Sequence, residues 1–96
     1  MPSAQADIPT EWGSRYLGQL CAHFAHKPEL DVVRQEDSGV IRFPSGECSL
    51  SATADTLRLR LDCRDRMALD RLQEVIDKHL QRFAFRDPLV IDWRPL

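Results

Sequence analysis

The residues best suited to chemistry are the three histidines, His23, His26 and His79. His23 and His26 are three positions apart on a predicted helix, so their imidazoles could share one metal ion, with His79 as a third ligand. Three histidines and an open coordination position suit a catalytic zinc or a non-haem iron. However, no carboxylate is placed to complete the set, and His79 matches an apolar helix face, where a buried neutral histidine is the more ordinary role. We therefore expect no cofactor, with zinc or iron at these histidines as the alternative.

One flank of the first predicted helix carries side chains that a solvent-exposed helix seldom displays. They are an indole, a phenol, an amide, two imidazoles and an amine: Trp12, Tyr16, Gln19, His23, His26 and Lys27. The first five fall within an arc of roughly 80° by helical geometry. Such groups are common at half-buried helix boundaries, which is a structural explanation. They are also enriched in ligand pockets and partner surfaces, so we take these six as the candidate binding surface.

The sequence carries no familiar catalytic arrangement. It has no Gly-x-Ser-x-Gly turn, no glycine-rich phosphate loop and no His-Glu-x-x-His helix. Its three cysteines, Cys21, Cys48 and Cys63, are widely spaced and fall on predicted inward-facing positions, as buried free thiols do. The missing motifs and the buried thiols favour a protein that is not an enzyme, but they do not exclude an enzyme.

Hydrophobic periodicity predicts two helices. The first begins after Thr10, a predicted N-cap, and ends near His26, before Pro28. Its apolar positions recur at helical spacing and form a core stripe: Gly13, Leu17, Leu20, Cys21 and Phe24. The second helix begins at Asp65, another predicted N-cap, and ends near Arg82.

Alternating apolar and polar residues predict the strands. The candidates are Leu30–Gln35, Gly39–Phe43, Glu47–Thr53, Thr56–Cys63 and, after the second helix, Leu89–Trp93. A weak edge strand is predicted at Asp7–Pro9, and residues 1–7 are expected to be disordered. The elements predict a single α+β domain over residues 1–96, in the order (β)-α-β-β-β-β-α-β. Its fold is expected to be an antiparallel sheet of four to six strands with two helices on one face.

Charge and hydropathy exclude several classes of function. The net charge of −2 argues against a dedicated nucleic-acid binder. Arg42, Arg58 and Arg60 share the predicted polar face of the sheet, but no aromatic residue accompanies them to stack on bases. We expect Arg58 and Arg60 to pair across strands with Asp62, Asp92 or Glu47, or to form a dimer face. No apolar run approaches the roughly 18 residues of a membrane helix. Residues 1–7 lack the features of a secretory signal, so we expect a cytoplasmic protein.

Three segments carry dense motifs. They are Ser-Arg-Tyr-Leu-x-Gln-Leu-Cys-x-His-Phe-Ala-His-Lys at Ser14–Lys27, Gly-x-Ile-x-Phe with Gly-x-Cys-x-Leu at Gly39–Leu50, and His-Leu-x-Arg-Phe-Ala-Phe-Arg at His79–Arg86. On these motifs the chain resembles the bacterial family catalogued as domain of unknown function 2218, over roughly Ile8 to Trp93. The resemblance implies a small stand-alone bacterial protein. Members also resemble a module attached to flavin-dependent siderophore-interacting reductases, which implies a role near iron uptake.

Together these observations predict a small bacterial cytoplasmic domain that binds a small molecule or a protein and is not an enzyme, in iron or siderophore metabolism. Two alternatives stay open. One is a small metal-dependent enzyme that uses the histidine cluster, and the other is a structural homodimer. Neither nucleic acid nor a membrane is an expected partner.

Overall fold

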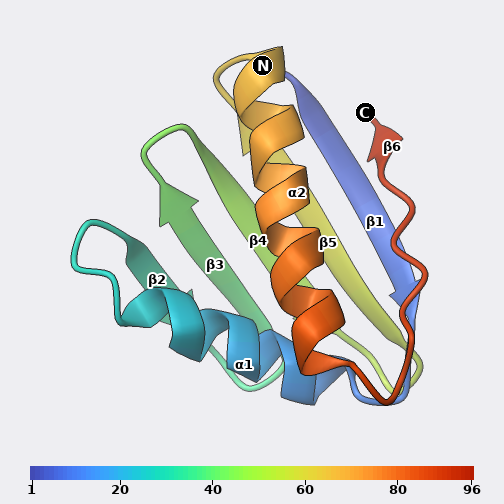
Figure 1. Ribbon diagram of the computed structural model, residues 1–96. Coiled ribbons are helices and arrows are strands. Elements are labelled where there is room, and N and C mark those ends of the chain that lie inside the picture. Colours follow the sequence, from blue (N-terminus) through green and yellow to red (C-terminus); the bar gives the residue numbers. More distant parts are fainter.

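Six antiparallel strands form one sheet, and both helices lie on the same face of it (Figure 1). The computed structural model describes residues 1–96. In chain order the elements are β1 (Ser3–Pro9), α1 (Gly13–Ala25), β2 (Asp31–Arg34), β3 (Ser38–Phe43), β4 (Gly46–Ala52), β5 (Thr56–Cys63), α2 (Arg66–Phe83) and β6 (Arg94–Pro95). The sheet order is β2-β3-β4-β5-β1-β6. The predicted fold class is therefore confirmed.

The core lies between the helices and one face of the sheet. On β5, Leu57, Leu59 and Leu61 are fully buried and alternate with exposed or half-buried polar residues, as the sequence predicts. Their antiparallel partners on β1 are Ile8, Ala6 and Ala4. Small alanines opposite large leucines leave room on this face for α2, which packs on β5.

The two helices cover different parts of the sheet. α1 crosses the ends of β2, β3 and β4, whereas α2 runs along β5, and the start of α1 lies near the end of α2 (Figure 1). The predicted core stripe of α1 is confirmed, since all five of its residues are buried: Gly13, Leu17, Leu20, Cys21 and Phe24. Neither helix has the length and apolarity needed to cross a membrane.

Of the two predicted N-caps, one is correct. The Asp65 side chain accepts a hydrogen bond of 2.8 Å from the backbone N–H of Ala68, which satisfies a donor that the first helical turn leaves unpaired. Thr10 is not the cap of α1, because the helix begins at Gly13 and Trp12 precedes it without a side-chain cap. The Thr10 hydroxyl instead accepts a hydrogen bond of 3.1 Å from the N–H of Trp12 and shapes the approach to the helix.

The N-terminal expectation is wrong. Residues 1–7 are not disordered, because Ser3–Pro9 forms β1, which pairs with β5 on one side and β6 on the other. It is an internal strand of the sheet rather than an edge. Ala4, Ala6 and Ile8 alternate inward, but two alanines give a weak hydrophobic signal, so the sequence pattern underestimates the strand.

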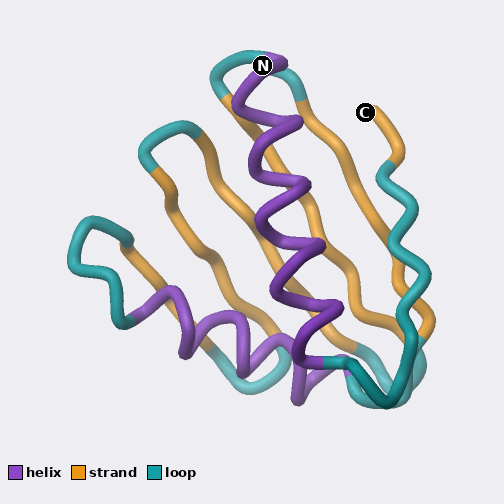
Figure 2. The backbone as a smooth tube through the Cα atoms, viewed as in Figure 1, coloured by secondary structure: helices purple, strands orange, loops and turns teal.

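The last strand is also misplaced by the sequence pattern. Residues 89–93 form no strand, and the chain runs as a loop beside β1 before β6 (Figure 2). Two side chains of α2 hold this loop: Gln81 Nε2 donates to the carbonyl of Leu89 at 3.0 Å, and Asp77 Oδ1 accepts from the indole of Trp93 at 2.8 Å. These bonds direct the loop to α2 instead of the sheet edge, so only Arg94–Pro95 pairs with β1.

Candidate functional site

A pocket of about 440 Å³ lies where the start of α1 meets the end of α2. Residues from both motif-dense helical segments and the loop after α2 line it: Trp12, Arg15, Tyr16, Phe83, Phe85, Arg86 and Asp87. The volume is within the range of small-molecule sites. The fold thus brings together two segments that are far apart in the sequence.

A polar network forms one wall of this pocket. Asp87 Oδ2 accepts hydrogen bonds from the hydroxyls of Thr10 at 3.0 Å and Tyr16 at 3.1 Å. Burial raises the pKa of the Tyr16 phenol, and the hydrogen bond to the Asp87 carboxylate raises it further. Tyr16 therefore remains protonated near neutral pH and acts as a donor that fixes Asp87.

The other walls combine exposed aromatic rings with guanidinium groups. Trp12 is 53% exposed and Phe85 is 73% exposed, although both are large hydrophobic residues. The Arg86 guanidinium lies 5.2 Å from the centroid of the Phe85 ring, in a cation–π contact. Neither Arg15 nor Arg86 forms an ion pair. Their positive charge is therefore free to meet a ligand.

The fold places the six residues of the predicted binding surface in different surroundings. Only Trp12 and Tyr16 line the pocket. Gln19 is half-buried, and its Oε1 is buried without a hydrogen-bond partner. His26 and Lys27 are exposed at the end of α1 and do not line the pocket.

His23 contacts α2 instead of the pocket. The ring centroids of His23 and His79 are 4.4 Å apart, and the ring of Phe24 lies 5.0 Å from that of His23. His79 is half-buried, and its Nδ1 lies 2.7 Å from the carbonyl oxygen of Val75. A carbonyl only accepts, so this Nδ1 carries the proton and donates. His79 therefore has a hydrogen-bond partner inside the domain, as a structural histidine does, although its ring is half-buried rather than buried.

The three histidines proposed as alternative metal ligands do not converge. His23 and His79 are in contact, but no group of three or more His, Cys, Asp or Glu side chains is placed to hold a metal ion. The spacing of His23 and His26 on one helix suggested a pair, whereas the contact with His79 comes from tertiary packing.

Sequence reasoning missed most of the pocket. Arg15, Phe83, Phe85, Arg86 and Asp87 were not among the candidate site residues, although all of them line it. A usable signal was present in the run Phe-Ala-Phe-Arg-Asp, because Phe85 lies beyond the periodic apolar face of α2 and is followed by two charged residues. An aromatic side chain outside a core stripe is expected to be exposed, and an exposed aromatic side chain beside charged groups is a signal of a binding surface.

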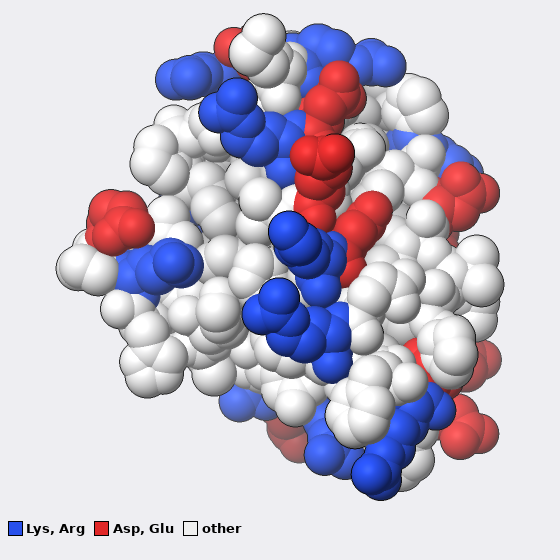
Figure 3. All heavy atoms as spheres, viewed as in Figure 1, with Lys and Arg blue, Asp and Glu red and all other residues white.

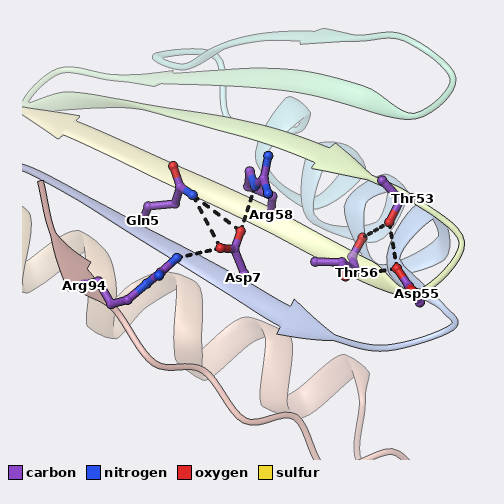
Figure 4. Close-up of polar contacts among 7 residues, drawn as sticks. All are labelled: Gln5, Asp7, Thr53, Asp55, Thr56, Arg58 and Arg94. Atoms are coloured by element: carbon purple, nitrogen blue, oxygen red, sulfur yellow. Dashed lines mark hydrogen bonds and ion pairs between the residues drawn. The ribbon is translucent and has the colours of Figure 1, made fainter.

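The uncovered face of the sheet carries paired charges rather than a site. Asp7 on β1 accepts a hydrogen bond of 2.7 Å from Arg58 Nε and also pairs with Arg94 (Figure 4). The bond from Arg58 is the main reason that the pKa of Asp7 is lowered. Arg60 pairs with Asp62, one of its expected partners, but the two lie on the same strand rather than across strands. The expected partners of Arg58 are wrong, because it pairs with Asp7 on β1, which the sequence predicts only as a weak edge strand.

Figure 4 also shows how the β4–β5 turn is closed. The hydroxyls of Thr53 and Thr56 both donate to Asp55 Oδ1, at 3.2 Å and 3.1 Å. Such side-chain bonds favour a tight turn, which fixes the register of β5 against β4.

Comparison with known proteins identifies the family. No curated protein matches the chain. A solved structure, described as the NMR structure of PA4090 from Pseudomonas aeruginosa, is similar at 33% sequence identity and a TM-score of 0.81, over 98% of this chain and 96% of that one. The family model described as "Uncharacterized protein conserved in bacteria (DUF2218)" matches residues 5–94. The chain therefore belongs to this bacterial family, as its motifs predict.

Proposed function

We propose that this chain is a non-enzymatic binding domain whose pocket between the start of α1 and the end of α2 holds a small molecule. The observation that carries the proposal is the exposure of Trp12 and Phe85 beside two guanidinium groups, Arg15 and Arg86, that have no ion-pair partner. Exposed aromatic surface costs free energy in water, and a bound ligand would cover it.

A second surface pocket differs from the first in that its charged groups are already paired, and this difference supports the choice of the first pocket as the binding site. It has about 420 Å³ and lies at the β3–β4 turn, where it is lined by Arg42, Glu47 and Asp62 among others. Here the charges are already satisfied, since Arg42 pairs with Asp31 and Glu47, and Asp62 pairs with Arg60. A ligand at this hollow would have to compete with existing ion pairs, whereas one at the first pocket would not.

The groups at the pocket favour binding over catalysis. Two hydroxyl donors already occupy Asp87 Oδ2, so this oxygen is not free to take a proton from a ligand. The raised pKa of Tyr16 has the same consequence for its phenol. Burial also raises the pKa values of Cys21 and Cys63, so neither thiol is activated as a nucleophile.

The cellular setting is part of the proposal. We place the domain in the bacterial cytoplasm and in iron or siderophore metabolism, on the resemblance to the module attached to siderophore-interacting reductases. A small molecule is preferred to a protein partner because the aromatic residues line a hollow rather than a flat patch.

Protein-observed NMR tests the proposal. The chain has two tryptophans, so its two indole N–H signals separate the pocket from the rest of the fold: Trp12 lines the pocket, and Trp93 is bound to Asp77. A fragment collection that contains neutral, anionic and cationic aromatic compounds should include members that shift the Trp12 indole signal at millimolar concentration and leave the Trp93 signal in place.

A matched pair of variants provides the control. Phe85 and Met67 are 73% and 72% exposed, but only Phe85 lines the pocket. Phe85→Ala should weaken every fragment that shifts Trp12, and Met67→Ala should weaken none. The proposal is wrong if no fragment of any charge shifts Trp12, or if both substitutions weaken binding equally.

A further inference from the structure

We propose that the ligand of this pocket is a planar aromatic carboxylate, held by Arg15 and Arg86 through its carboxylate and by Trp12 and Phe85 through its ring. The inference rests on the proposed function and adds the chemical class of the ligand.

The charge of the pocket selects an anion. Two guanidinium groups and one carboxylate line it, and that carboxylate, Asp87, already accepts hydrogen bonds from Thr10 and Tyr16 through Oδ2. The local formal charge is therefore positive, although the whole chain has a net charge of −2. Figure 3 shows several Lys and Arg side chains at the bottom of the view, where α2 ends, with some Asp and Glu side chains beside them.

Arginine specifies the kind of anion. Its planar fork of N–H donors matches the two oxygens of a carboxylate, and such bidentate pairs are among the stronger hydrogen-bonded contacts in proteins. Arg15 and Arg86 are both exposed and without acidic partners, so a ligand carboxylate would displace water and no existing ion pair.

The aromatic residues select a flat ligand. Trp12, Tyr16, Phe83 and Phe85 supply ring faces and edges, and the contact of Arg86 with Phe85 shows that a planar group already lies against one of them. A flat aromatic ring can take offset or edge-to-face positions against these rings, whereas a saturated ring of the same carbon skeleton cannot stack in this way.

A pocket of aromatic rings with one carboxylate could also suggest a quaternary ammonium ligand, which binds to aromatic cages through cation–π contacts. The two unpaired arginines argue against it here, because they would repel a cation. This ligand class therefore becomes an outcome of the test.

Four probes of similar skeleton separate charge from ring character. They are 2-naphthoate, its neutral counterpart 2-naphthamide, its saturated counterpart decahydro-2-naphthoate, and the cation (2-naphthylmethyl)trimethylammonium. Each is titrated into the full chain and followed by the Trp12 indole signal. We expect 2-naphthoate to bind about tenfold more tightly than either the amide or the saturated acid, and the cation to bind most weakly.

Arginine variants identify the contacts. Arg15→Gln and Arg86→Gln should each weaken 2-naphthoate about tenfold and change the affinity for 2-naphthamide by less than twofold. Arg71→Gln is the matched control, because Arg71 is also exposed and without an ion pair but lies outside the pocket, and it should leave both affinities unchanged.

The outcomes distinguish the two proposals. If the amide or the cation binds more tightly than 2-naphthoate, and Phe85→Ala still weakens it, the carboxylate assignment is wrong while the binding pocket stands. If Arg71→Gln weakens 2-naphthoate as much as Arg15→Gln does, only the overall charge matters and the assignment is again wrong. If no probe or fragment shifts Trp12, the pocket itself is not a binding site and both proposals fail.

Discussion

The Tyr16 hydroxyl donates a 3.1 Å hydrogen bond to Asp87, 71 residues further along the chain. With the bond from Thr10 to the same oxygen, it ties the start of α1 to the loop that follows α2. These hydrogen bonds hold Asp87 against the start of α1, beside the other residues that line the candidate site. The positions of Trp12 and Phe85 depend on this link, so the link can be tested through both stability and binding.

Tyr16→Phe should lower the free energy of unfolding at pH 7 by about 0.5–1.5 kcal/mol, because it removes this hydrogen bond and keeps the ring. The pKa of Tyr16 is raised in the folded state, so its stabilising contribution is fully present below the ordinary value of 10.0 and is lost as the pH rises through the folded pKa. The difference between the two proteins should therefore shrink above pH 10. Urea unfolding of the parent and of Tyr16→Phe, at pH 7 and above pH 10, measures this difference in the free energy of unfolding. Equal stability of the two proteins at pH 7 would contradict the role of the hydrogen bond.

The sequence predicts the fold well where one face of an element is strongly apolar. The strict alternation of Thr56–Cys63 matches β5 from end to end, and the stripe through Leu17, Leu20 and Phe24 matches the buried side of α1. The sequence predicts only the last three residues of β1, because Ala4 and Ala6 contribute little hydrophobic signal, although both are buried. Periodicity thus detects large buried side chains and misses small ones.

The candidate site is harder to predict than the fold. Trp12 and Tyr16 stand out because aromatic groups interrupt a polar helix flank, and both line the pocket. Arg86 and Asp87 lie in a loop, where no periodicity marks orientation. Arg15 and Arg86 are without ion pairs because the fold brings no acidic side chain close enough to either, and the sequence pattern does not contain that information.

The core of α1 is tested by truncation. Leu20 and Phe24 are 0% and 2% exposed, so Leu20→Ala or Phe24→Ala should each lower the free energy of unfolding by about 2–5 kcal/mol. Arg58→Ala is the contrasting surface change, since its ion pair with Asp7 is exposed and should contribute about 0–1 kcal/mol. Urea denaturation gives both values, and a core variant within a few tenths of a kcal/mol of the parent would contradict the assignment.

Two glycines should respond to alanine with opposite signs. A Cβ at Gly46 would lie 2.7 Å from Cys63 Sγ and 2.8 Å from the carbonyl oxygen of Asp62, so Gly46→Ala should cost about 1–3 kcal/mol. At Gly18 the nearest atom is the end of the flexible Arg34 side chain, at 2.8 Å, which can move away. Gly18→Ala should then stabilise α1, by up to about 1 kcal/mol, because alanine favours a helix. Thermal unfolding measures the change in stability of each variant relative to the parent. A loss of stability in both variants would refute the local geometry at Gly18.

The uncovered face of the sheet should not bind nucleic acid. Arg42, Arg58, Arg60 and Arg94 lie on or beside it, but each is paired with an aspartate or glutamate. Phosphate contacts would have to break these pairs, and the net charge of −2 opposes the approach of a polyanion. In a fluorescence-anisotropy titration at physiological salt, single- and double-stranded oligonucleotides should show no binding in the micromolar range. Micromolar affinity with a steep dependence on salt would assign this face a function.

The partial burial of His23 between the two helices should make stability fall in mild acid. Burial lowers the pKa of His23 from its ordinary value of 6.5, and His79, Lys27, His26 and Arg82 lower it further by their positive charge. A group with a depressed folded pKa stabilises the protein above its unfolded pKa, and this contribution is lost as the pH falls through the folded pKa.

The free energy of unfolding of the parent should therefore decrease between pH 7.5 and pH 5, and His23→Gln should flatten that decrease. The contrasting variant is His26→Gln, which keeps the half-buried His23 and removes only one of the smaller charge effects on it, so this variant should keep most of the steepness of the parent. Urea unfolding at half-unit steps of pH measures the three profiles. If His23→Gln and the parent lose stability in parallel, neither burial nor the neighbouring charges oppose the protonation of His23, and the prediction is wrong.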